Sequence, residues 1–116
     1  MRSLELTVQT GRGRGLFDLT ARCSAFVRDA AGDGDGLLSV FVPHATAGLV
    51  IVEIGAGSDE DLVAVLDRLL PRLAPPSLTV PVIGGALALG TWQSICLLDP
   101  NVDNPVRTVR LSFVAG

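Results

Sequence analysis

The stretch "SLTVPVIGGALALGTWQSICLL" (residues 77–98) carries the pattern on which the fold depends. Apolar and β-branched residues fill Ser77–Ile83, the pair Gly84-Gly85 follows, and a second, largely apolar run completes the stretch. Glycine adopts the turn conformations that other residues avoid, so two such runs around a glycine pair predict strands joined by a turn. We therefore expect the C-terminal half of the chain to be mainly β-strand.

Strands are also expected on both sides of this stretch. Leu4, Leu6 and Val8 alternate with polar residues, which is the pattern of a strand with one buried face. Apolar runs bounded by glycine, proline or polar residues predict further strands over 37–42, 49–53 and 108–114.

Two helices are predicted between these strands. Thr20 can cap the first, in the segment "LFDLTARCSAFVRDAA". Ser58, with Asp61 three residues later, resembles a capping box at the start of the second. About seven strands and two helices predict an α+β fold, with an antiparallel, sandwich-like sheet in one domain over 1–116.

Composition excludes several classes of protein. The chain has 116 residues, of which 48% are hydrophobic and 18% charged, so it can form a core and is not of the disordered type. A net charge of -3 argues against a broad nucleic-acid surface. No apolar run approaches the roughly 20 residues of a membrane span. The two cysteines are far apart, which indicates buried free thiols and favours a cytoplasmic location.

His44 is the only histidine and is followed by the small residues of "ATAG". An isolated histidine beside a proline is often structural. The small residues up to Gly48, however, leave room for a ligand, and an imidazole can act as an acid, a base or a metal ligand. Thr46 can donate its hydroxyl to a phosphate or stabilise the turn. Both interpretations stay open here.

Two more polar residues adjoin apolar runs. Glu53 ends the run that begins at Leu49, and it is either a partly desolvated site carboxylate or an exposed acid at a strand end. Gln93 follows the only tryptophan, Trp92, and can bond either a ligand or a neighbouring backbone group.

The polar loop "DPNVDNPVR" begins at Asp99 and ends at Arg107. Its acids and amides suggest a cation site weakly, because their spacing is not that of a helix-loop-helix calcium site. Arg107 can clamp a phosphate with two hydrogen bonds, or it can be an ordinary surface arginine.

Three segments together resemble the YjbQ-like family, the so-called secondary thiamine-phosphate synthase enzymes. "SLTVPVIGGALALGTWQSI" closely resembles the signature of that family. "PHATAGLVIVE" looks like its His-Thr-Ser-Ala-Gly-Leu type segment, which ends in glutamate, and "GLFDLT" resembles an early Gly-x-x-Asp-Ile-Thr element. The similarity runs over most of the chain.

The resemblance implies an α+β sandwich that assembles as a homotrimer, with a site near the subunit boundary and a weak thiamine-phosphate synthase activity. The alternative is a non-catalytic trimer that binds a small phosphorylated or metal-bound ligand. The resemblance and the residues themselves together give three sets of candidates. The catalytic candidates are His44, Glu53 and Gln93, and the substrate-binding candidates are Thr46, Gly48 and Arg107. The candidate ligands for a divalent metal, zinc or magnesium, are His44, Glu53 and Asp99.

The chain also departs from the family pattern. Residues 54–58 replace an Asn-x-Asp-Pro element, so one acid is missing unless Asp59 replaces it. The family has a histidine-containing loop before its signature, whereas "LLPRLAPPSLTV" passes directly from the second predicted helix to the strand. One imidazole and one carboxylate make a poor metal site, because catalytic zinc usually has three protein ligands. Either the loop was lost in evolution, or the sequence omits a segment near Arg72 and Leu73.

Overall fold

The computed structural model describes residues 1–10, 15–53, 74–99 and 105–116. This part of the chain contains one helix, α1 (Thr20–Ala31). Its strands are β1 (Arg2–Gln9), β2 (Gly15–Asp18), β3 (Gly36–Phe41), β4 (Gly48–Val52), β5 (Ser77–Ile83), β6 (Ala86–Leu87), β7 (Ser94–Asp99) and β8 (Val106–Ala115).

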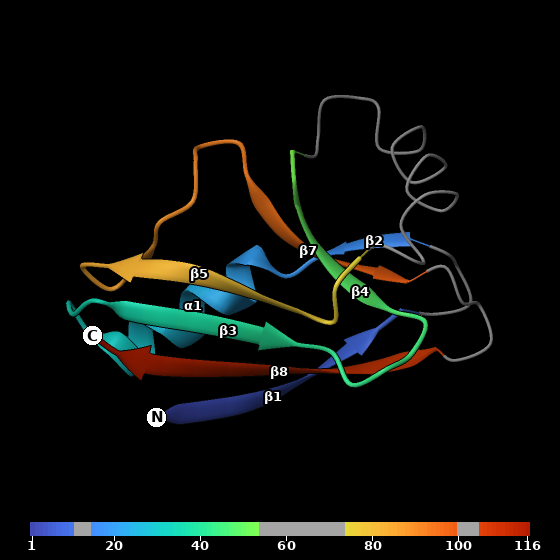
Figure 1. Cartoon of the computed structure of the whole chain (residues 1–116), viewed down its shortest axis with the longest axis horizontal. Coiled ribbons are helices and arrows are strands. Elements are labelled where there is room, and N and C mark those ends of the chain that lie inside the picture. The colour runs from blue at the N-terminus through green and yellow to red at the C-terminus, as the bar shows by residue number, and fades with distance from the viewer. Residues whose placement is uncertain (11–14, 54–73, 100–104) are drawn as a thin grey trace.

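The strands form two antiparallel sheets. One has five strands in the order β1-β8-β3-β5-β6, and the other has three in the order β2-β7-β4. Figure 1 shows α1 behind the five-stranded sheet, and the outer face of that sheet toward the viewer. The predicted α+β class with antiparallel strands is confirmed. The second predicted helix, after Ser58, lies outside the described residues, and closure into a full sandwich stays a prediction.

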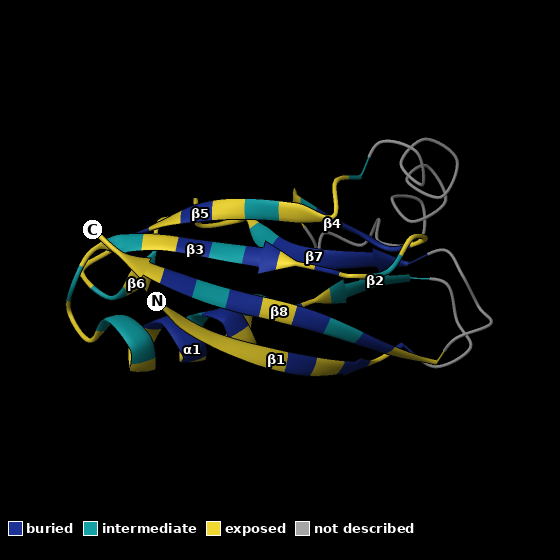
Figure 2. Cartoon of the chain, turned by 60° about the horizontal axis from the view of Figure 1, so that its bottom comes forward, coloured by how far each residue is buried: buried dark blue, intermediate teal, exposed yellow. Residues whose placement is uncertain are grey.

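The core follows from the alternation of the strands. Inward residues of β8 are buried at Val109, Leu111 and Phe113, and the register places Phe113 beside Leu38 of β3. Helix α1 adds the buried residues Cys23, Phe26 and Val27, which are spaced to share one helical face. Figure 2 shows the resulting alternation of buried and exposed positions along β3 and β8. Among the described residues, no helix has the length and apolar character that crossing a membrane requires.

The start of α1 differs from the prediction. Leu19 occupies the N-cap position and Thr20 is the first helical residue, so the predicted Thr20 cap is wrong. The carboxylate of Asp18 accepts a hydrogen bond from the Thr20 backbone N–H at 2.9 Å. The Thr20 hydroxyl instead accepts one from the Ile95 N–H, also at 2.9 Å, and so connects the helix to β7. The Thr20 hydroxyl therefore makes a long-range hydrogen bond to β7, whereas the local sequence predicts that it caps the helix.

The predicted glycine turn joins β5 to β6. Gly84 and Gly85 have φ angles of 59° and 77°, in the region that favours glycine. A Cβ on Gly85 would lie 1.9 Å from the Gly32 carbonyl oxygen, whereas one on Gly84 would meet nothing within 4 Å. Gly85 is therefore constrained by both its backbone angle and a close neighbour, and Gly84 by its angle alone.

This difference predicts unequal effects of two matched substitutions. Gly84→Ala should lower the free energy of unfolding by about 1 kcal/mol, the usual cost of a left-handed alanine. Gly85→Ala should lower it by clearly more, because the turn must also move away from Gly32. Urea denaturation of both variants measures this, and equal losses would contradict the close approach.

Candidate functional site

A hydrogen bond joins the His44 side chain to strand β8. Its Nε2 atom accepts a hydrogen bond from the Thr108 backbone N–H at 3.0 Å. A backbone N–H can only donate, so Nε2 carries no proton in this arrangement and the neutral ring is protonated at Nδ1. The connection bends back at this point, because the Ala47 N–H donates to the His44 carbonyl at 3.3 Å. His44 therefore presents a donor at Nδ1 to its surroundings.

A buried ion pair lies beside this connection. Arg107 donates through Nε to Asp99 Oδ2, and the two side chains are 4% and 0% exposed. Asp99 is the last residue of β7, whereas Arg107 points inward near the start of β8. Arg107 also donates through Nη2 to the Thr46 hydroxyl at 3.3 Å. Charge pairing and hydrogen bonding together offset the cost of removing both charges from water.

Four of the predicted site residues thus lie together: His44, Thr46, Asp99 and Arg107, here called the His44 cluster. They come from the β3–β4 connection, the end of β7 and the start of β8. The sequence did not indicate the part played by Thr108, because it contributes a backbone N–H and not its side chain.

Glu53 and Gln93 lie at the other end of β4. The register pairs Gly48 with Leu98 and Val52 with Ser94, so its continuation puts Glu53 opposite Gln93. Five residues at about 3.3 Å each separate Gly48 from Glu53 by about 17 Å along the strand. Figure 1 shows β4 running from the region of β8 to the far side of the molecule. Within one chain, the predicted site residues therefore form two separate groups.

Gln93 and Gly48 have local structural roles as well. The Gln93 side-chain oxygen accepts a hydrogen bond from the Gly90 N–H at 2.7 Å and closes the turn before β7. Gly48 is buried, and a Cβ there would lie 2.4 Å from the Ala74 Cβ. The space beside Gly48 is thus filled by the chain itself.

The described residues of one chain do not fit a divalent metal. No group of three or more His, Cys, Asp or Glu side chains that could hold an ion occurs among them. The Nε2 atom of His44 is occupied by Thr108, and Asp99 is paired with Arg107. Glu53 lies beyond the opposite end of β4.

The two cysteines are free and buried, as predicted. Burial, followed by the nearby negative charge of Asp18, raises the pKa of the Cys23 thiol to about 12, and Arg22 opposes this in part. Cys23 is therefore protonated at neutral pH and is not a nucleophile there.

Comparison with known proteins identifies the family. The model of the family described as "UPF0047 protein YjbQ-like" matches residues 4–76 and 72–116. The chain belongs to this family. The family membership that the sequence resemblance predicted is thereby confirmed.

Curated YjbQ-like relatives match almost the whole chain. A UPF0047 protein of Mycobacterium bovis is 53% identical over 132 positions, which cover 96% of this chain and 99% of the relative. A UPF0047 protein of Archaeoglobus fulgidus is 34% identical, with 93% and 96% covered. A crystal structure of a hypothetical protein from Aeropyrum pernix has a TM-score of 0.84 at 29% identity and full coverage of both chains. A YjbQ/UPF0047 protein of Clostridium acetobutylicum gives 0.82 at 27% identity, with 96% and 99% covered.

The comparison with the YjbQ-like relative from Mycobacterium bovis also bears on the missing histidine loop. Since 96% of 116 residues is about 111, about 21 of the 132 aligned positions have no residue in this chain. The two matches to the family model overlap at residues 72–76, where the resemblance led us to expect a histidine-containing loop. The backbone around Arg72 and Leu73, which would decide between loss and omission, lies outside the described residues.

The buried ion pair of Asp99 and Arg107 predicts that the single and double variants differ greatly in their free energy of unfolding. Asp99→Asn or Arg107→Met leaves one buried charge without its partner and should lower the free energy of unfolding by about 3–5 kcal/mol. The double variant Asp99→Leu/Arg107→Met should lose much less than the sum of the single losses.

The exposed pair of Arg110 and Glu5, at 2.8 Å, is the matched control. Their side chains are 51% and 59% exposed, so Glu5→Gln should cost about 1 kcal/mol or less. Denaturant unfolding measures all four variants. A loss for Asp99→Asn as small as that for Glu5→Gln would count against a buried ion pair.

Proposed function

We propose that this YjbQ-like protein binds a small phosphorylated ligand at the His44 cluster. The observation that carries the proposal is the set of donors in the cluster: Nδ1–H of His44, the hydroxyl of Thr46 and the guanidinium of Arg107. Two of the five N–H donors of Arg107 bond Asp99 and Thr46, so others are left for a ligand. Phosphate oxygens accept hydrogen bonds only and suit such a set.

Access to the cluster supports the same proposal. Thr46 is exposed and His44 is half-buried, so a ligand can reach both without opening the fold. Asp99 and Arg107 lie behind them and are almost fully buried. The buried pair fixes the position of Thr46, and a ligand phosphate would add to an arrangement that is already held in place.

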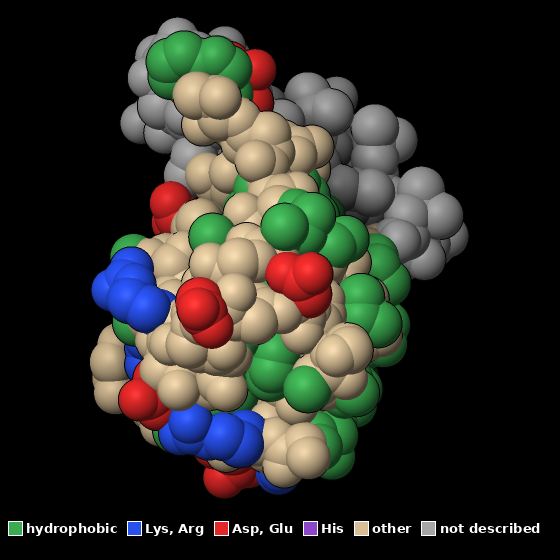
Figure 3. Space-filling view, turned by 90° about the vertical axis from the view of Figure 1, so that its left-hand side faces the viewer, with side chains coloured by type: hydrophobic (Ala, Val, Ile, Leu, Met, Phe, Trp, Pro, Cys, Tyr) green, Lys and Arg blue, Asp and Glu red, His purple; other side chains and the backbone are tan. Residues whose placement is uncertain are grey.

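Assembly of subunits would complete the site. Glu53 and Gln93 can join the His44 cluster only if a neighbouring subunit supplies them, and we propose that the homotrimer does so. Support comes from the outer face of the five-stranded sheet, where Leu37, Phe41 and Val114 are 48%, 41% and 47% exposed. Register places Leu37 beside Val114, so these side chains lie on one face. Figure 3 shows hydrophobic side chains along its right-hand side, which is the front of Figure 1. An uncovered apolar face of this kind is typical of a contact surface.

A thiamine-phosphate synthase reaction is the second candidate, favoured by the same donors. The ring nitrogen of a thiazole phosphate would form a bond with the methylene carbon of a pyrimidine pyrophosphate. The bond from that carbon to the pyrophosphate oxygen would break, and pyrophosphate would leave with the electron pair. Arg107, Thr46 and the Nδ1–H of His44 would stabilise the charge that develops on the leaving group. The divalent metal stays a prediction, and no step depends on it.

A cytoplasmic location belongs to the same proposal. Cys23 and Cys96 are free thiols in the structure. Thiols stay reduced in the cytoplasm, whereas oxidising compartments favour disulfides. Fractionation of cells followed by detection of the protein would test the location.

Ligand binding and turnover can be measured in one set of experiments. Calorimetry with the thiazole phosphate and the pyrimidine pyrophosphate should show binding by the wild type. His44→Ala and Thr46→Val should each weaken it about tenfold or more, since each removes a donor to a charged group. Thr108→Ala keeps the backbone N–H that holds His44, so it should bind as the wild type does.

Thiamine phosphate formed in the same mixtures separates the two functions. Binding with turnover supports the transferase, and binding without turnover supports the binding protein. If neither compound binds, both proposed functions are refuted. Mixing His44→Ala subunits with Glu53→Gln subunits tests the shared site. Recovery of binding is expected if His44 and Glu53 of one site come from different subunits. No recovery would contradict a site between subunits.

A further inference from the structure

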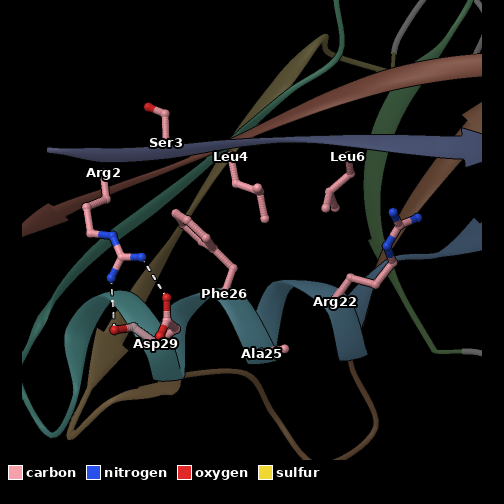
Figure 4. Close-up of a pocket in the computed structure, with 8 residues that line it drawn as sticks. All are labelled: Arg2, Ser3, Leu4, Leu6, Arg22, Ala25, Phe26 and Asp29. Atoms are coloured by element: carbon pink, nitrogen blue, oxygen red, sulfur yellow. Dashed lines mark hydrogen bonds and ion pairs between the residues drawn. The ribbon is translucent and has the colours of Figure 1, made fainter.

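A concavity lies between α1 and β1, away from the His44 cluster. It has a volume of about 380 Å³, within the range of small-molecule sites. Figure 4 shows Leu4 and Leu6 pointing down from β1 and Phe26 rising from α1 between the ends of the groove. None of the residues that line it belongs to the His44 cluster.

The wall of this groove contains an apolar side chain that the fold leaves uncovered. Leu4, Leu6 and Val8 alternate along β1 and so share its inward face. Leu6 and Val8 are 8% and 6% exposed, whereas Leu4 is 44% exposed. Leu4 therefore faces the interior side of the sheet without being covered by the helix, and a bound apolar group would remove it from water.

The two ends of the groove differ in charge. At one end, Arg2 donates to the Asp29 carboxylate at 2.6 Å and to the Asp29 carbonyl at 3.0 Å, so its charge is balanced. At the other end, Arg22 extends from α1 toward β1 (Figure 4). Arg22 makes no hydrogen bond or ion pair within the described ranges. The groove thus combines an apolar wall with one arginine that has no ion-pair partner among the described residues.

We propose that this groove binds an amphipathic carboxylate, with its alkyl chain against Leu4 and Phe26 and its carboxylate on Arg22. A guanidinium matches a carboxylate with two parallel hydrogen bonds, which fixes the orientation of the ligand. The ion pair of Arg2 and Asp29 closes the far end, so the groove accepts a short chain. Binding is reversible and requires no chemical step.

Octanoate is the probe that tests this, by calorimetric titration of the full chain. Saturable one-to-one binding is expected. Arg22→Ala should weaken it about tenfold or more, because the charged hydrogen bonds are lost. Leu4→Trp should abolish it by filling the groove. Arg28→Ala removes an arginine from the same helix, outside this groove, and should bind octanoate as the wild type does.

Two further probes separate the contribution of the carboxylate charge from that of the alkyl chain. Octanol lacks the charge and acetate lacks the chain, so both should bind far more weakly than octanoate. The proposal is overturned if octanoate does not bind, if Arg22→Ala and Arg28→Ala have the same effect, or if octanol binds as well. A change in the solution mass of Leu4→Trp would also overturn it, since the groove would then be a contact between subunits.

Discussion

The buried pair of Asp99 and Arg107 is the contact on which the arrangement of the site depends. Asp99 ends a strand of the three-stranded sheet, and Arg107 lies in a strand of the five-stranded sheet. Through its second nitrogen, Arg107 also holds Thr46 in the connection that leads from one sheet to the other. One charge pair therefore joins both sheets and the segment between them, and its desolvation makes the loss of either partner costly.

Two hydrogen bonds from β8 fix the connection between β3 and β4, and they determine which polar groups it presents. The Thr108 N–H fixes the imidazole of His44, and Arg107 fixes the hydroxyl of Thr46. Both contacts come from adjacent residues of β8, so the strand sets the separation between the two side chains. The cluster presents hydrogen-bond donors at His44 and Arg107, so an anion suits it better than a metal ion does. Our proposal of a phosphorylated ligand rests on this donor character, and in particular on the proton at Nδ1 of His44.

Much of this could be predicted from the sequence, and the exceptions have physical causes. Period-two alternation and glycine turns indicate strands such as β1 and β5 because those signals are local. The role of Thr20 was missed because its partner, Ile95, is 75 residues away. Arg107 was interpreted as either a phosphate clamp or an ordinary surface arginine, and the second alternative is wrong because alternation along β8 turns the side chain inward onto Asp99. The separation of His44 from Glu53 follows from the direction of β4, which the nine-residue spacing does not reveal.

His44 is the only histidine, so a single measurement on its ring tests the central claim directly. In protein labelled with ¹⁵N on the imidazole, NMR at neutral pH reports which nitrogen carries the proton. The hydrogen bond from Thr108 predicts a neutral ring protonated at Nδ1, with Nε2 coupled to the Thr108 amide proton. A ring protonated at Nε2, or free exchange between the two forms, would show that the connection is not held on β8 and would contradict this account.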